Sequence, residues 1–194
     1  MEKLTRKDLY TLEDYAEIRS EFRQKVMAHK AKRTLSLGDH VRLFFEDRLT
    51  MLYQIQEMLR AEKIFEKEGI EEELSVYNPL IPDGTNWKAT MMLEYGHTQE
   101  RDEALKKLVD IENQVFAKIN DFEPIAAIAD EDLPRSQKDR TSTVHFLRFE
   151  LPPAAIAAIK NGASFGFMIK HPFYKAEAFP VPESLANILR QDLA

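Results

Sequence analysis

The stretch Trp87-Lys88-Ala89-Thr90-Met91-Met92-Leu93-Glu94-Tyr95 decides the fold class of this chain of 194 residues. Its odd-numbered positions are all apolar, and most of the even-numbered positions between them are polar or charged. An alternation of period two is typical of a β-strand with one buried face. We therefore predict a half-buried strand over residues 87–95.

Further extended segments lie mainly on the C-terminal side of this stretch. A hairpin that turns at Asn120-Asp121 is predicted over residues 114–129, and single strands are predicted over 141–151 and 163–171. On the N-terminal side the chain reaches the strand through Pro82-Asp83-Gly84. Proline fixes φ there and glycine closes the turn, so a loop is predicted over residues 78–84.

Helices are predicted mainly on the N-terminal side of the strand. Apolar residues recur at helical spacing over residues 5–33, and again between the N-cap candidate Asp47 and the C-terminal candidate Gly69. A small hairpin over residues 34–46 separates these two helices. Shorter helices are predicted over residues 98–110, over 153–162 and after Pro182.

This segregation of helices and strands predicts an α+β fold. Long N-terminal helices are expected to pack on a mainly antiparallel sheet of about five strands in the C-terminal half. Because no repeat, low-complexity tract or linker divides the sequence, we predict one domain over residues 1–194, mostly helical in 1–77 and sheet-rich in 78–194. Residues 130–140 are almost wholly polar and are predicted to form a mobile loop.

Composition excludes several classes of function. The chain has 27 Lys and Arg against 33 Asp and Glu, a formal net charge of −6, which disfavours a nucleic-acid partner. The absence of cysteine excludes disulfides, thiol nucleophiles and thiolate metal sites. The N-terminal residues lack the apolar core of a signal peptide, and no run is long enough to span a membrane, so a cytoplasmic protein without membrane contact is expected.

Polar residues from three segments are candidates for one ligand pocket. Glu57 and Arg60 share a face of the predicted helix, which also suits a surface ion pair. Arg148 can bind a carboxylate or phosphate, or it can pair with Glu150 on the same strand face. His145 alternates with Leu147 and Phe149, as a core histidine would. The full candidate set is Glu57, Arg60, Asn78, Asp83, His145 and Arg148.

A metal site would have to use histidine and carboxylate ligands. His145 and His171 lie on two predicted strands that could be neighbours, and Glu94 or Glu150 could join them. A crossover through residues 152–162 would make the strands parallel and hold the histidines on the order of 20 Å apart, whereas antiparallel pairing would bring them together. The chain has no His-x-x-x-His pair, so no metal or other cofactor is expected.

The acidic run Asp130-Glu131-Asp132 does not have the pattern of a calcium loop. An EF-hand needs glycine at its sixth position and glutamate at its twelfth, and this chain has Arg135 and Thr141 there. The run is therefore interpreted as the acidic beginning of a loop.

Five stretches together resemble one known family. They are Glu46-Asp47-Arg48, Tyr53-Gln54-Ile55-Gln56-Glu57-Met58-Leu59-Arg60, Asn78-Pro79-Leu80-Ile81-Pro82-Asp83-Gly84, Ile128-Ala129-Asp130-Glu131-Asp132-Leu133 and Val144-His145-Phe146-Leu147-Arg148-Phe149-Glu150-Leu151. In this order they resemble the uncharacterised bacterial family called domain of unknown function 3501, over almost the whole chain. The resemblance implies no catalytic residues. Genes of that family tend to lie beside genes for rubrerythrin-like proteins and for an iron–sulfur oxidoreductase subunit, which implies a redox or peroxide-defence setting.

Three functions remain open at this point. Because the sequence has no phosphate-binding glycine loop and no nucleophile–base motif, the first is a non-catalytic accessory protein of a redox module, with a rubrerythrin-like or iron–sulfur partner implied by the resemblance. The second is a domain or enzyme that binds a small acidic metabolite in the candidate pocket. The third is a histidine and carboxylate metal protein. The sequence leaves the oligomeric state open.

Overall fold

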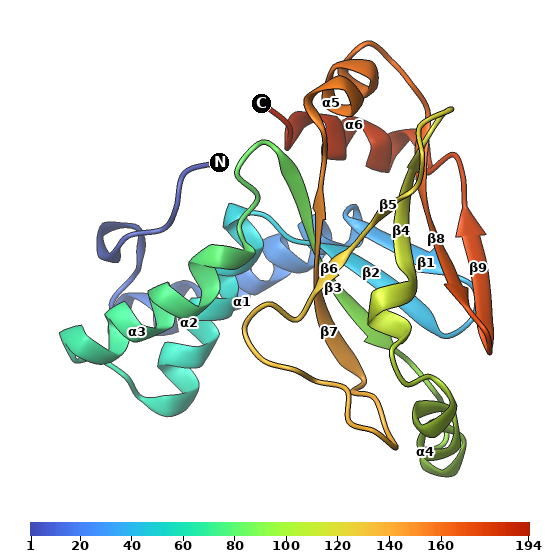
Figure 1. The fold of residues 1–194 in the computed structure, drawn as a ribbon. Helices are drawn as coiled ribbons and strands as arrows, with labels where there is room; N and C mark the ends of the chain where they lie inside the picture. The colour runs from blue at the N-terminus through green and yellow to red at the C-terminus, as the bar shows by residue number, and fades with distance from the viewer.

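The alternating stretch forms the middle strand of a five-stranded antiparallel sheet in the computed structural model, which describes residues 1–194 (Figure 1). This strand, β3, pairs with β2 on one side and β7 on the other. The odd-numbered side chains of β3, which are Trp87, Ala89, Met91 and Leu93, are buried in the core, as the alternation predicts. In spatial order the strands are β1 (Thr34–Leu37), β2 (Val41–Phe45), β3 (Asn86–Leu93), β7 (Val144–Glu150) and β6 (Ile128–Ala129).

A second antiparallel sheet packs against the first and encloses the main core. Aromatic side chains meet across the two sheets: Trp87 of β3 lies 4.8 Å from Phe165 between ring centroids, and Phe149 of β7 lies 5.1 Å from Phe167. These rings are fully buried or nearly so, which makes the space between the sheets the largest apolar cluster. The strand order is β5 (Ile125–Ala126), β4 (Val115–Ile119), β8 (Phe165–His171) and β9 (Tyr174–Ala178).

Three helices lie on the opposite side of the five-stranded sheet and form a layer of their own (Figure 1). They are α1 (Leu12–Ala31), α2 (Arg48–Glu62) and α3 (Lys67–Tyr77). We call them the helix layer. Apolar residues of α2 and α3 form a second cluster, separate from the main core, together with Leu4 and Ile81; its helical members are Met51, Ile55, Leu59 and Leu74.

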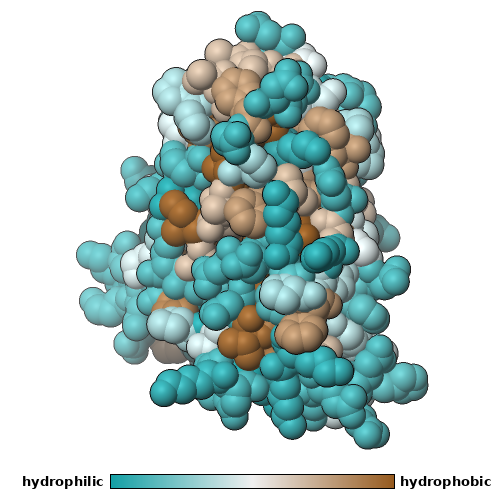
Figure 2. Space-filling view, turned by 45° about the vertical axis from the view of Figure 1, so that its right-hand side comes forward, coloured by the Kyte–Doolittle hydropathy of each residue, from teal (hydrophilic) through white to brown (hydrophobic).

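The remaining elements close the two ends of the sheets. Helices α5 (Pro153–Lys160) and α6 (Glu183–Gln191) lie at one end, and α4 (Thr98–Lys107) lies at the other (Figure 1). Short 3-10 segments complete the chain at Arg6–Asp8, Asn78–Leu80 and Ile111–Gln114. On the face shown in Figure 2, hydrophobic residues are interspersed with hydrophilic ones.

The predicted α+β class and its antiparallel strands are confirmed, but the strands form two sheets instead of one sheet of about five. The predicted hairpin over 114–129 divides between the sheets: β5 pairs with β4, and two residues later β6 pairs with β7. The predicted hairpin over 34–46 joins the five-stranded sheet as β1 and β2. A half-exposed edge strand, β9, has no counterpart among the predicted elements.

The predicted helix from Asp47 to Gly69 is two helices. Asp47 is its N-cap, as predicted, and its carboxylate accepts a hydrogen bond from the Thr50 backbone amide at 2.9 Å. The helix ends at Lys63, whose left-handed φ of 55° terminates the hydrogen-bond ladder. Gly69 consequently lies inside α3 and ends neither helix.

The strands that carry His145 and His171 are neither parallel nor antiparallel neighbours, although these were the two predicted alternatives. His145 lies on β7 in the five-stranded sheet, and His171 lies on β8 in the four-stranded sheet. The two strands are therefore not paired in either direction, because the connection through α5 leads from one sheet to the other.

A buried ion pair joins the end of α1 to the C-terminal segment. The guanidinium of Arg33 donates to the backbone oxygens of Phe45 and Glu46 and to the carboxylate of Asp192. Asp47 lies 3.4 Å from the same guanidinium. Burial raises the pKa of Asp192 to about 6; Arg33 opposes this shift, and Asp47 adds to it.

The raised pKa of Asp192 predicts a pH-dependent stability. Between pH 4 and 6 the folded chain keeps this proton while the unfolded chain releases it, so the contribution of Asp192 to stability falls as the pH rises. Relative to Asp192→Asn, the wild type is expected to lose roughly 2–3 kcal/mol of unfolding free energy from pH 4 to 7. Urea unfolding of both proteins across this range measures the difference, and a constant or rising difference would contradict the expectation.

Candidate functional site

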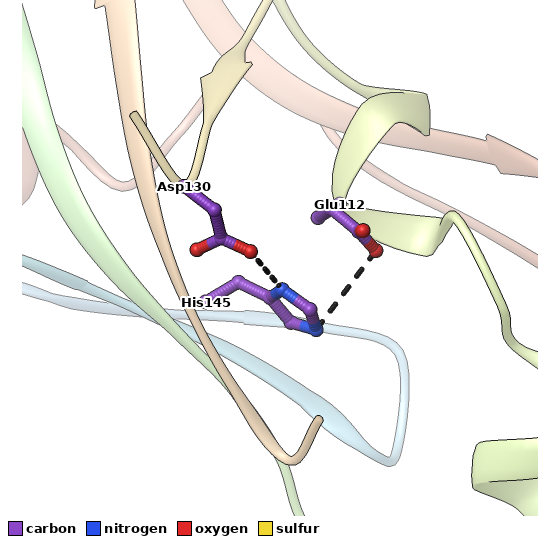
Figure 3. A group of neighbouring side chains, drawn as sticks. All are labelled: Glu112, Asp130 and His145. Carbon is purple, nitrogen blue, oxygen red and sulfur yellow. Dashed lines mark hydrogen bonds and ion pairs between the residues drawn. The ribbon is translucent and has the colours of Figure 1, made fainter. Parts of the chain in front are cut away.

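A buried cluster surrounds His145, which has no exposed surface (Figure 3). Its Nδ1 lies 2.7 Å from Oδ2 of Asp130, the residue that follows β6. Its Nε2 faces Glu112 of the 3-10 segment, whose Oε2 is 3.9 Å away. Because a carboxylate only accepts hydrogen bonds, the contact with Asp130 places a proton on Nδ1.

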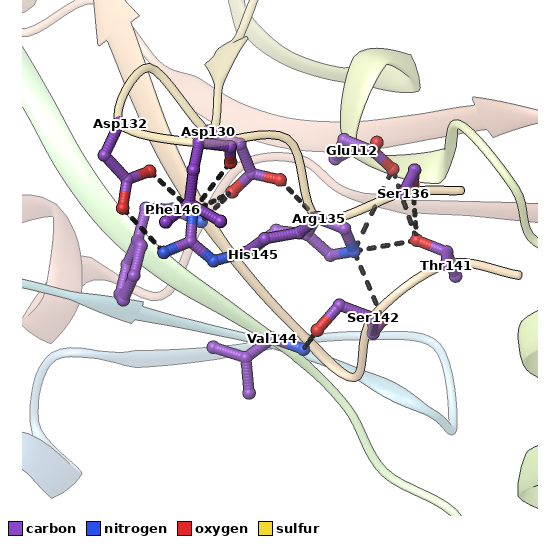
Figure 4. Close-up of polar contacts among 11 residues, drawn as sticks. Glu112, Asp130, Asp132, Arg135, Ser136, Thr141, Ser142, Val144, His145 and Phe146 are labelled. Carbon is purple, nitrogen blue, oxygen red and sulfur yellow. Dashed lines mark hydrogen bonds and ion pairs between the residues drawn. The ribbon is translucent and has the colours of Figure 1, made fainter.

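Hydroxyl groups complete this cluster (Figure 4). Thr141 Oγ1 lies 2.9 Å from Nε2 of His145 and 2.7 Å from Ser136 Oγ. The other oxygen of Asp130 accepts from the Phe146 backbone amide at 2.9 Å and from Arg135 at 3.2 Å. Residues 130–140 were predicted to form a mobile loop, but Asp130 at one end and Thr141 just beyond the other end fasten this segment to β7.

The order Thr141, His145 and Asp130 is that of a hydroxyl–imidazole–carboxylate relay. However, Thr141 and His145 are buried, and neither lines the two large cavities of the molecule. A metal ion at Nε2 would find Glu112 as a ligand and Asp130 as the partner that orients the ring, but it would have to replace the contact with Thr141. The cluster thus fits best as a hydrogen-bonded anchor, in agreement with the interpretation of His145 as a core histidine.

The first large cavity, of about 660 Å³, lies between the helix layer and the outer face of the five-stranded sheet. Eight of its 14 lining residues are hydrophobic, among them Met27 of α1, Met51 of α2 and Phe44 of β2. This volume lies within the range of small-molecule sites in proteins.

Glu46 lines this apolar cavity and has a buried carboxylate. The residue follows β2 and is 4% exposed. Its Oε1 accepts a hydrogen bond from Thr90 Oγ1 at 2.6 Å, whereas no donor of the protein reaches Oε2. Lys30 also lines the cavity, and so does Arg42, whose guanidinium pairs with Glu94 at 3.0 Å.

The second large cavity, of about 650 Å³, lies beside the first, and Phe146 lines both. Arg148 of β7 lines it and is held by Glu131 at 2.7 Å and by Glu150. The hydrogen bond with Glu131, followed by that with Glu150, raises the pKa of Arg148 despite its partial burial. Lys88 of β3 lies directly across from Arg148 in the strand register and lines the same cavity.

Of the six predicted pocket residues, only Asp83 and Arg148 share a cavity. Asp83 accepts hydrogen bonds from Thr85 and Asn86, and these outweigh the effect of burial and lower its pKa. The six side chains therefore do not converge as the polar-pocket hypothesis requires.

The other predicted residues have separate structural roles. Glu57 faces α1, where it accepts from Tyr15 Oη at 2.7 Å and pairs with Arg19 at 2.7 Å. The hydrogen bond with Arg19 lowers the pKa of Glu57, and Arg60 makes no ion pair with it within 4.0 Å. Asn78 holds the N-terminal segment through both backbone groups of Leu4, at 2.7 and 2.9 Å.

His171 does not take part in the His145 cluster. Its Nε2 lies 3.0 Å from the backbone oxygen of Val109, and its Nδ1 accepts from the Phe173 amide. The acids named as partners also act elsewhere: Glu94 pairs with Arg42, and Glu150 with Arg148. The predicted combination of His145 and His171 with Glu94 or Glu150 is not formed.

Sequence reasoning missed Glu46, Lys88 and Glu112. The same alternation that puts Arg42 and Phe44 on one face of β2 extends to Glu46, so the sequence alone indicates on which face of the sheet Glu46 lies. The sequence does not indicate that Glu46 is buried, because the helices that cover this face of the sheet are distant in sequence.

No helix of the structure has the length and apolar character needed to cross a membrane.

The comparisons with known proteins are consistent with each other. No curated protein matches the chain. A crystal structure from Burkholderia pseudomallei, described as a novel protein of unknown function, is 47% identical to it, with a TM-score of 0.93 and coverage of 100% of both chains. The profile of the family described as "Protein of unknown function (DUF3501)" matches residues 3–193. The chain therefore belongs to the DUF3501 family.

Proposed function

We propose that this protein binds a small molecule in the first cavity, between the helix layer and the five-stranded sheet. The unpartnered Oε2 of Glu46 is the observation that carries the proposal. A buried polar atom without a partner costs roughly 1–3 kcal/mol or more, so native proteins contain few of them. An acceptor oxygen in an apolar cavity is useful where a ligand supplies the donor.

The lining of the cavity indicates the chemistry of its ligand. Met27, Met51 and Phe44 suit an apolar body, and methionines adapt to different shapes. Glu46 requires a head group that donates a hydrogen bond, of which a primary amine is the simplest. A charge-assisted bond to a carboxylate is about twice as strong as a neutral one.

The test uses n-hexylamine as the probe and hexanoate as the comparison of equal length. Hexylamine is expected to raise the melting temperature and to bind saturably by calorimetry, whereas hexanoate is expected to do neither. Mass spectrometry of the protein as isolated would identify a retained natural ligand. If hexylamine and hexanoate bind equally, or if neither binds, the proposal is wrong.

Glu46→Gln is expected to abolish hexylamine binding while raising the free energy of unfolding by about 1 kcal/mol. Glutamine keeps an oxygen for Thr90 and removes a buried charge. Glu177→Gln is the matched control, because Glu177 is half-exposed and pairs with Lys118 on the other sheet. The control should bind the probe normally and change stability by less than about 0.5 kcal/mol. Unaltered binding by Glu46→Gln would contradict the role of Glu46.

Two earlier hypotheses have less support. Arg148 is already held by two carboxylates, so no observation favours an acidic ligand at that residue. The accessory role in a redox module, with a rubrerythrin-like or iron–sulfur partner, rests on the family resemblance and stays a prediction. Co-purification of the tagged protein from its host tests it, and recovery without a redox partner at any salt concentration would count against it.

A further inference from the structure

Lys88 occupies an unusual position in the second cavity. It is half-buried on β3, opposite Arg148 in the strand register. Four acids line the same cavity, namely Asp83, Glu131, Asp132 and Glu150, yet none forms an ion pair with Lys88 within 4.0 Å. The side chain of Lys88 therefore has no carboxylate in direct contact with it.

The acids of the cavity are already engaged by other partners. Glu131 accepts two hydrogen bonds from Arg148, at 2.7 and 2.8 Å. Glu150 accepts from Arg148 and from the Thr85 hydroxyl, and Asp83 accepts from the Thr85 backbone amide and from Asn86. Arg148 therefore competes with Lys88 for the carboxylates and adds a positive charge beside it.

Both effects favour the neutral amine of Lys88. Burial lowers its pKa, and the nearby charge of Arg148 lowers it further, while three of the carboxylates oppose the shift. A desolvated lysine beside another cation is a known way to obtain a nucleophilic amine at neutral pH.

We propose that Lys88 is a carbonyl-reactive amine that forms an imine with a small aldehyde or ketone in the second cavity. Lys88 Nζ bonds to the carbonyl carbon and its proton moves to the carbonyl oxygen, giving a carbinolamine. This intermediate then loses one water molecule and leaves a C=N bond. Val76, Leu80 and Phe146 line the cavity and suit a short apolar chain on the carbonyl compound. The inference goes beyond the proposed function and does not depend on a ligand at Glu46.

The test is reductive trapping at neutral pH with butanal and sodium cyanoborohydride, followed by peptide mapping. Lys88 is expected to be alkylated several-fold faster than Lys118, which pairs with Glu177 at 2.8 Å and serves as the internal control. Its rate should also reach a plateau at a lower pH than that of Lys118. Equal or slower labelling of Lys88 would overturn the proposal.

The variant Arg148→Gln tests whether Arg148 is the cause of the reactivity of Lys88. This change frees Glu131 and Glu150 to pair with Lys88, so the plateau of labelling should move to higher pH and the advantage over Lys118 should shrink. An unchanged pH profile would contradict the role of Arg148. Hexylamine binding depends on Glu46 and is measured separately, so failure of one proposal leaves the other tested on its own.

Discussion

Replacing His145 by alanine is expected to lower the free energy of unfolding by about 3–5 kcal/mol, the usual cost of taking a partner away from a buried carboxylate. The change leaves Asp130 without its 2.7 Å partner and Thr141 without its 2.9 Å partner. Both side chains are buried or nearly so, and each loses its partner away from bulk solvent. The segment 130–141 would also lose its main attachment to β7.

Urea unfolding in the presence of EDTA measures this loss and keeps any bound metal ion out of the comparison. His97→Ala is the matched control, because His97 is exposed at the beginning of α4. The control is expected to change stability by less than about 0.5 kcal/mol. If the two variants are equally stable, the cluster does not anchor the segment.

Replacing Trp87 by alanine is expected to cost about 3–5 kcal/mol, as for other large buried aromatic residues. Trp87 is fully buried between the sheets and packs on Phe165 and Phe167. Its Nε1 also donates to the backbone oxygen of Leu189 at 2.9 Å, which ties α6 to the core. The variant loses the ring contacts and this link together.

Trp87→Phe separates the two contributions. Phenylalanine keeps most of the ring packing and removes the donor, so it should cost about 1–3 kcal/mol, chiefly through the unpaired carbonyl of Leu189. Circular dichroism is the suitable measurement, because Trp87 is the sole tryptophan and its fluorescence disappears in both variants. Equal losses in the two variants would show that packing around Trp87 contributes little.

The sequence predicts local elements well because their causes are local. The alternation around Trp87 and the N-cap at Asp47 both appear in the structure as predicted. The division of residues 114–129 between two sheets could not be predicted, since it depends on which distant strand is free to pair with Ile128. Periodicity shows that a strand has a buried face, but not which sheet that strand joins.

The same limit applies to the candidate site. That His145 is a core histidine follows from its alternation with Leu147 and Phe149, and the structure agrees. Its partners Asp130 and Glu112 come from segments whose approach is purely tertiary. The acidic run that begins at Asp130 was interpreted only as the acidic beginning of a loop, and the structure shows that Asp130, Glu131 and Asp132 pair with His145, Arg148 and Arg135 respectively.

The separate apolar cluster of the helix layer has a consequence for exchange with solvent. Because α2 and α3 bury their apolar residues mainly against each other and against Leu4 and Ile81, we expect these two helices to open together as one cooperative unit. Such a sub-global opening would leave Trp87 and the space between the sheets closed. The backbone amides of α2 and α3 are then expected to exchange with a free energy smaller than that of unfolding the whole chain.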